Sequence, residues 1–86
     1  MIKHTVTAGT TEKQDVMVTV SPGENIQIII ETTPHPRFCD TICEIVKQTL
    51  AELSVRDARV VVSDYGALKF VIQARVRAAI KKAGEG

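Results

Sequence analysis

Apolar and polar residues alternate over the first third of the chain with the period of two that is typical of β-strands. A weak alternation over residues 2–6 ends at the breaker Ala8-Gly9-Thr10, which predicts a short first strand. The alternation over 16–20 is clearer, and an apolar run over 26–31 follows the turn-forming segment 21–25. Because two strands are separated by a short loop, the pattern predicts a β-hairpin. The many β-branched side chains suit a half-buried sheet surface.

The later part of the chain has mainly helical spacing. The segment 32–36 holds two prolines, which lack the amide hydrogen that a strand ladder needs. An amphipathic helix is predicted over 38–53, with core-facing positions Phe38, Ile42, Ile45, Val46, Thr49, Leu50 and Leu53. The run Val60–Val62 predicts a buried fourth strand that ends at the turn 63–66. A second helix is predicted over 67–83, with an apolar face of Leu68, Ile72, Val76, Ala79 and Ile80.

The order of these elements, βββαβα, predicts an α+β fold of two layers. We expect a small, mostly antiparallel four-stranded sheet with two helices on one face. Residues 1–86 are expected to form one domain, because the chain is shorter than the length at which chains divide.

Composition narrows the classes of function. Lys and Arg number 11 and Asp and Glu number 10, so there is almost no net field to attract a polyanion, and nucleic acid is not expected as a partner. Residues 1–7 show no secretory signal, and no apolar run is long enough to span a bilayer. We therefore expect a cytoplasmic protein without membrane contact, in which Cys39 and Cys43 are reduced thiols.

Three potential metal ligands, His35, Cys39 and Cys43, follow one another at four-residue intervals. On one helix they would form a stripe of soft ligands for a transition metal. A structural site normally has four ligands, however, the only other histidine is His4, and Pro36 interrupts the stripe. The sequence therefore favours no metal site, with the cysteines as small apolar residues.

Two stretches of the chain resemble the acyl carrier (gamma) subunit of citrate lyase. The first is AGTTEKQDV over 8–16, which resembles the loop near the N-terminus of that subunit. The second is DYGAL over 64–68, continued by ARV over 74–76 and AAI over 78–80, which is similar to its last helix. The carrier of malonate decarboxylase is a related family with a similar serine-borne arm, and the 64–68 stretch favours the citrate lyase family.

The resemblance implies a non-catalytic subunit that carries a phosphoribosyl-dephospho-coenzyme A arm, joined to a serine by a phosphodiester. In that family the arm exchanges acetyl for citryl at the transferase subunit, and the citryl thioester is then cleaved at the lyase subunit. The resemblance implies alpha and beta subunits as partners. A prosthetic-group transferase attaches the arm. Tethering turns diffusive encounters into intramolecular ones at high effective concentration, while the chemistry belongs to the cofactor and the partner chains.

The chain departs from this family at the attachment position. The family has two serines between the Glu and the Asp of the loop, the first of them modified, where this chain has Lys13 and Gln14. Lys13 cannot be esterified. Thr11 is an alternative attachment residue, but the modifying enzyme would then have to tolerate an oxygen at a shifted position and an extra methyl group. Two interpretations stay open: a carrier with an unconventional attachment residue, and an unmodified assembly or binding module that has lost the arm.

The loop and the last helix supply the candidate docking residues. Glu12 and Asp15 have no histidine or other base beside them in the loop, so they are interpreted as turn residues rather than catalytic groups. Five basic residues lie on the last helix, and Arg75 is the one that we expect to face an acidic partner. We therefore predict docking through Glu12, Asp15 and Arg75, on a loop over 8–15 that is exposed and mobile.

Overall fold

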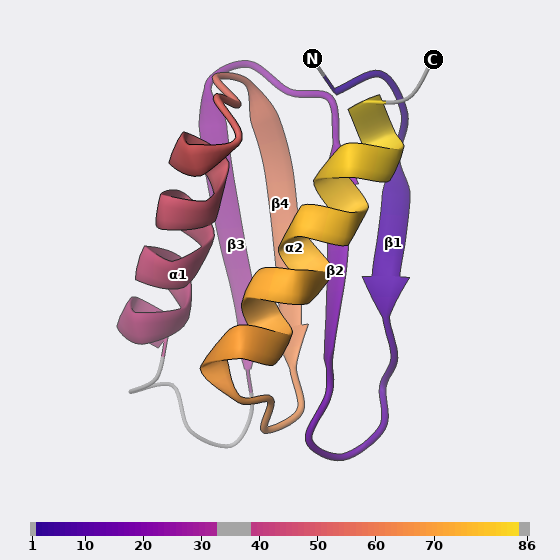
Figure 1. The fold of residues 1–86 in the computed structure, drawn as a ribbon, viewed down its shortest axis with the longest axis vertical. Coiled ribbons are helices and arrows are strands. Elements are labelled where there is room, and N and C mark those ends of the chain that lie inside the picture. Colours follow the sequence, from indigo (N-terminus) through magenta and orange to yellow (C-terminus); the bar gives the residue numbers. More distant parts are fainter. Residues whose placement is uncertain (1, 33–38, 85–86) are drawn as a thin grey trace.

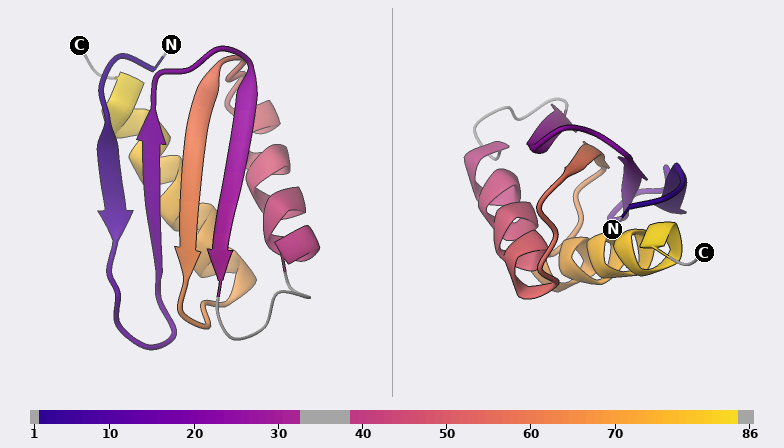
Figure 2. Two further views of the ribbon diagram at one scale, coloured as in Figure 1. Left: turned by 180° about the vertical axis from the view of Figure 1, so that it is seen from behind. Right: turned by 90° about the horizontal axis from the view of Figure 1, so that it is seen from above.

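The computed structural model describes residues 2–32 and 39–84 of the chain. Four strands form one sheet, and both helices lie on the same face of it (Figures 1 and 2). The elements follow the predicted order βββαβα, which confirms the two-layer α+β fold. They are β1 (Val6–Gly9), β2 (Val16–Ser21), β3 (Ile26–Thr32), α1 (Cys39–Glu52), β4 (Ala58–Asp64) and α2 (Lys69–Gly84).

The predicted hairpin between β2 and β3 is wrong, because β4 lies between these two strands. The strand order is β1-β2-β4-β3, with β4 antiparallel to β2 and parallel to β3. Parallel neighbours need a crossover connection, and α1 supplies it between β3 and β4. The loop from β2 to β3 crosses the start of β4, where the Ala58 amide donates to the Asn25 carbonyl oxygen at 3.0 Å. The sheet is mixed, with two antiparallel pairings and one parallel pairing.

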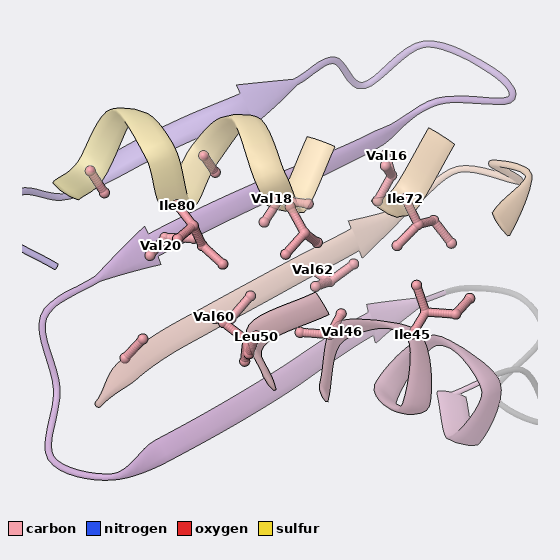
Figure 3. Packing of buried hydrophobic residues seen from close by; sticks show 14 of the residues in the cluster. Val16, Val18, Val20, Ile45, Val46, Leu50, Val60, Val62, Ile72 and Ile80 are labelled. Carbon is pink, nitrogen blue, oxygen red and sulfur yellow. The ribbon is translucent and has the colours of Figure 1, made fainter. Parts of the chain in front are cut away.

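The core lies between the sheet and the two helices, as Figure 3 shows. Alternate valines of β2 and β4 point to the helices and are fully buried, which is why the strand sequences alternate. Thr49 is buried among them, and its hydroxyl donates to the Ile45 carbonyl oxygen at 2.8 Å. The buried apolar residues are Ile2, Val16, Val18, Val20, Ile42, Ile45, Val46, Leu50, Ala58, Val60, Val62, Ile72, Val76, Ala79, Ile80 and Ala83.

Two leucines that were predicted to face the core are exposed. Leu53 follows the end of α1 and is 42% exposed. The helix ends there because Ser54 has a left-handed backbone with φ of 57° and the Val55 amide donates back to the Leu50 carbonyl oxygen. Leu68 precedes α2 and is 61% exposed. Its carbonyl oxygen accepts from the Val71 and Ile72 amides, so its backbone begins the helix while its side chain points to solvent.

The ends of the described chain lie together. The amides of Lys3 and His4 donate to the Ala83 carbonyl oxygen at 2.8 and 3.3 Å. These bonds hold the segment before β1 against the end of α2, so the first strand begins at Val6 rather than at Ile2, although Ile2 is buried. Phe38, the predicted start of the first helix, lies outside the described residues. In the described ranges, neither helix is long and apolar enough to span a membrane.

Candidate functional site

The loop between β1 and β2 forms a tight turn at one end of the molecule (Figure 1). The Asp15 amide donates to the Glu12 carbonyl oxygen at 3.2 Å, which closes a four-residue turn over 12–15. Gln14 has a φ of 67°, as the third residue of a type II turn must. Lys13 occupies the other corner of this turn and is exposed. Position 13 therefore lies at the crown of the loop, where it is accessible to a large partner.

Hydrogen bonds hold the loop in shape from within. The Thr10 hydroxyl donates to Asp15 Oδ2 at 2.6 Å and accepts from the Glu12 amide at 3.2 Å. Its oxygen is therefore engaged on both sides. Thr11 and Glu12 are exposed on the outside of the turn.

A second set of hydrogen bonds anchors the loop to the connection between β4 and α2. The Gln14 amide donates to the Tyr65 carbonyl oxygen at 2.7 Å, and the Tyr65 amide donates to the Asp15 carbonyl oxygen at 3.0 Å. Two connections that are about 50 residues apart in sequence thus form one continuous surface. Residues 10–14 are exposed, as expected for the loop over 8–15, whereas Ala8 and Gly9 belong to β1 and are half-buried, and Asp15 is half-buried as well.

Asp15 and Arg75 form an ion pair that joins the loop to α2. Arg75 Nε donates to Asp15 Oδ1 at 3.2 Å, and Nη2 donates to Oδ2 at 3.0 Å, a two-pronged arrangement. The Val16 amide also donates to Oδ1 at 2.7 Å. The Thr10 hydroxyl, the Val16 amide and the Arg75 guanidinium together lower the Asp15 pKa to about 2. Asp15 is thus a structural carboxylate. The sequence indicated Asp15 and Arg75 separately as candidate docking residues, but it did not predict that they pair.

Three large apolar side chains that the site prediction missed are exposed on the connection from β4 to α2 and on the start of α2. Tyr65, Leu68 and Phe70 are 41%, 61% and 65% exposed, respectively. The sequence contained one indication of this exposure: Phe70 is a large apolar residue that lies off the apolar face of the predicted helix. A cavity of about 280 Å³ opens nearby between the two helices, lined by Thr41, Ile42, Ile45, Asp64, Gly66, Ala67, Lys69 and Ile72.

Comparison with known proteins assigns the family. A family model described as malonate decarboxylase delta subunit (MdcD) matches residues 3–83. The citrate lyase acyl carrier protein of Klebsiella pneumoniae is 44% identical over 80 residues, which cover 91% of this chain and 82% of that protein. The chain belongs to the citrate lyase acyl carrier protein family. The member from Halothermothrix orenii is 36% identical over 86 residues, covering 99% of this chain and 92% of its own length.

A solved structure shows the same fold at low sequence identity. A chain in the crystal structure of a Pseudomonas malonate decarboxylase hetero-tetramer in complex with malonate superposes with a TM-score of 0.79. The identity is 16%, and the match covers 96% of this chain and 87% of that one. The citrate lyase acyl carrier protein family and that chain therefore share one fold.

The loop does not fit a serine-linked phosphodiester at position 13. Such a bond needs a hydroxyl oxygen, and Lys13 offers an amine. The Thr10 hydroxyl already bonds to Asp15 and to the Glu12 amide. In the turn over 10–15 this leaves the exposed Thr11 hydroxyl as the oxygen nearest to the crown. The turn over 10–15 is exposed at residues 10–14, and it contains no serine.

Metal binding has no support in the described ranges. Over 2–32 and 39–84, no three His, Cys, Asp or Glu side chains lie close enough together to hold an ion. His35, the first member of the stripe considered from the sequence, lies outside those ranges, so the stripe as a whole is untested.

Proposed function

We propose that this chain is the acyl carrier (gamma) subunit of a citrate lyase-type complex, and that it carries, or derives from a carrier of, a phosphoribosyl-dephospho-coenzyme A arm. Its partners would be alpha and beta catalytic chains in the cytoplasm, and the chain itself would be non-catalytic. Support comes from relatives named citrate lyase acyl carrier protein that align over most of both chains. A chain of the same fold in a hetero-tetramer also favours a place within a multi-chain assembly.

The observation that carries this proposal is the position of residue 13. It lies at the crown of an exposed turn that is fixed to the rest of the molecule by the Asp15–Arg75 ion pair and by the bonds to Tyr65. A rigid base under an exposed residue suits presentation to a partner, because less entropy is lost on docking. In the family, the arm adds a thiol for acyl transfer; here the chain's own residues position the loop.

A second candidate, an unmodified assembly or binding module, is favoured by a specific observation. The amine at position 13 cannot form the ester, and the Thr10 hydroxyl is engaged inside the loop. In this interpretation the chain binds the same partners through the same end without presenting an acyl group. The two candidates differ in one measurable property, the covalent mass of the chain.

Intact-mass spectrometry of the protein made in its own host, with the prosthetic-group transferase present, distinguishes the candidates. A carrier would show an added nucleotide-containing group on the natural chain, whereas the unmodified module would show the bare polypeptide mass. The variant Lys13→Ser is expected to gain the group under both candidates. The matched control is Lys69→Ser, an exposed lysine outside the loop, which should give the same result as the natural chain. An adduct on the natural chain that disappears in Thr11→Val would establish a working carrier and rule out the unmodified module.

Co-purification tests the place in the complex. The natural chain, expressed with the alpha and beta chains of its host, is expected to purify with them in fixed proportion. Failure to associate, together with an unmodified Lys13→Ser variant, would contradict the proposal. In that case neither the transferase nor the catalytic chains would recognise the loop.

A further inference from the structure

β3 forms one edge of the sheet, and its sequence lacks the residues that usually protect such an edge. In the described chain, β4 pairs with one side of β3 and no strand pairs with the other. Because backbone groups alternate in direction along a strand, every second residue of β3 presents its amide and carbonyl groups to the free side. Natural edge strands are often short or carry lysine or proline. β3 spans seven residues, of which four are isoleucine and none is lysine, proline or glycine.

A groove of about 430 Å³ lies between β3 and α1. α1 is the outermost element on this side of the molecule and extends past the edge of β3 (Figures 1 and 2). The walls of the groove are mostly apolar, and its lining includes Ile26, Ile28, Cys43, Lys47, Leu50 and Ala51. The two isoleucines are alternate residues of β3 and so share one face of the sheet. A strand added at the edge of β3 would therefore lie under α1, with every second side chain directed into the groove.

Lys47 gives the groove a charge preference. It is the one charged residue in the lining, and it is exposed. The ion pairs of the described chain are Asp15–Arg75 and Glu52–Arg77, and Lys47 takes part in neither. A carboxylate on the groove side of an added strand would pair with the Lys47 ammonium group.

We propose that the free edge of β3 and this groove bind an extended segment of a partner protein, which adds a fifth strand to the sheet. Alternate residues of the segment are apolar and fill the groove, and one residue on the same side is acidic and pairs with Lys47. In this mode of recognition, main-chain hydrogen bonds supply affinity and the pockets for alternate side chains supply specificity.

The site lies toward the end of the molecule opposite the loop over 10–15 (Figure 1). A bound segment therefore leaves position 13 accessible, and neither the loop nor an arm takes part in binding it. The inference goes beyond the proposed function for this reason: it assigns a second contact, by which the chain is held at one end while the other end stays free.

The position of α1 favours a single extended segment over a second copy of the chain. Antiparallel pairing of β3 with β3 of another copy would place the helices of both copies on one face of a continuous sheet. Because α1 extends past the edge of β3, the two α1 helices would then collide (Figure 1). The occupant is therefore a terminal or linker segment that carries no helix over the added strand.

NMR titration of the full chain with a synthetic peptide tests the proposal. The probe is acetyl-Ser-Val-Thr-Val-Thr-Glu-Ser-amide, in which both valines and the glutamate share one side of a strand. We expect saturable shifts of the amide signals of β3 and α1, and slower exchange of the β3 amides. A peptide of the same composition in the order Ser-Val-Val-Thr-Thr-Glu-Ser should bind at least about tenfold more weakly, because its valines face opposite sides of a strand.

Variants of the groove make the test specific. Ala51→Trp fills the groove and should weaken binding at least about tenfold. Its matched control is Ala74→Trp, which changes an exposed alanine of α2 outside the groove and should alter the dissociation constant less than about twofold. Lys47→Glu should weaken binding about twofold to fivefold, and a probe with lysine in place of its glutamate should restore it. Circular dichroism of each variant shows whether the fold is retained.

The contrary outcomes are equally defined. The proposal would be overturned by the absence of saturable shifts up to the solubility limit of the probe, by equal binding of the two peptides, or by unchanged binding to Ala51→Trp. A chain that sediments as a dimer without peptide, with its β3 amides protected, would instead assign the edge to self-association. None of these measurements involves the alpha and beta chains, so a negative result would leave the proposed function intact.

Discussion

At the scale of single residues, Gly9 and Gly66 have similar backbone angles but very different surroundings. Their φ angles are 99° and 92°, in the left-handed region that residues with a side chain rarely adopt. A Cβ on Gly9 would lie 1.8 Å from the Val16 carbonyl oxygen, whereas a Cβ on Gly66 would have no heavy atom closer than 3.9 Å. Gly9 is therefore required by a close approach of the chain at the base of the loop, and Gly66 only by its backbone angle.

Alanine substitution should separate these two requirements. Gly9→Ala is expected to lower the free energy of unfolding by at least about 3 kcal/mol, because strain and overlap add. Gly66→Ala, the matched control, should cost about 1 kcal/mol, since only the backbone angle is unfavourable. Urea unfolding followed by circular dichroism measures both. Equal losses for the two variants would mean that the base of the loop is more open than the structure shows.

The Asp15 carboxylate should make the stability of the fold depend on pH in acid. Its folded-state pKa is lowered from 3.8 to about 2, so the unfolded chain binds the proton more tightly. The stabilisation is therefore fully present above the unfolded pKa, and is lost as the pH falls toward 2. Unfolding free energies of the natural chain and of Asp15→Asn should differ most near neutral pH and converge between about pH 4 and 2. A constant difference over that window would exclude the ion-paired carboxylate.

Sequence reasoning found the residues of the loop but not their contacts. The sequence singled out both Asp15 and Arg75. Their pairing depends on how β2 packs against α2, and the local sequence pattern cannot show this for two residues that are 60 positions apart. Leu68 matched the spacing of an apolar face, but its side chain precedes the first turn of the helix and so is not directed to the sheet. Position at an element boundary, rather than spacing, decided its exposure.

At the scale of elements, periodicity predicted both helices because each buries one stripe against the sheet. Ile42 of α1 and Ile72 of α2 are each 3% exposed, and both stripes are aliphatic. Replacing either with alanine is expected to lower the free energy of unfolding by about 2–5 kcal/mol, since a cavity is left under a helix. Leu53→Ala and Leu68→Ala should each cost less than about 1 kcal/mol, because these side chains are largely exposed. Chemical denaturation of the four variants measures these changes. Similar losses of unfolding free energy in all four would show that the helix faces are assigned wrongly.

The wrong hairpin shows what element patterns leave open. A short connection with turn-forming residues indicates that the chain reverses, and β2 and β3 do run in opposite directions. Such a connection does not show that the strands are neighbours, because it can pass over the end of a third strand. Here the Asp57 carboxylate accepts from the Asn25 amide at 2.8 Å and helps to hold the crossing loop in place. The continuous apolar run Val60–Val62 is typical of a central strand, and it was the available clue to the position of β4.

At the scale of the whole molecule, the sheet has two inner and two outer strands, and this arrangement should set the pattern of amide exchange. β2 and β4 are paired on both sides, whereas β1 and β3 form the two edges. Amides of β4 are expected to exchange more slowly than the outward-facing amides of β3 by about two orders of magnitude or more, because their exchange requires the sheet to open. Hydrogen exchange followed by NMR at neutral pH measures this, with β2 as the internal standard for an inner strand. A β2–β3 hairpin would give the opposite result: β4 would lie at the edge, half of its amides would exchange quickly, and β3 would be protected on both sides.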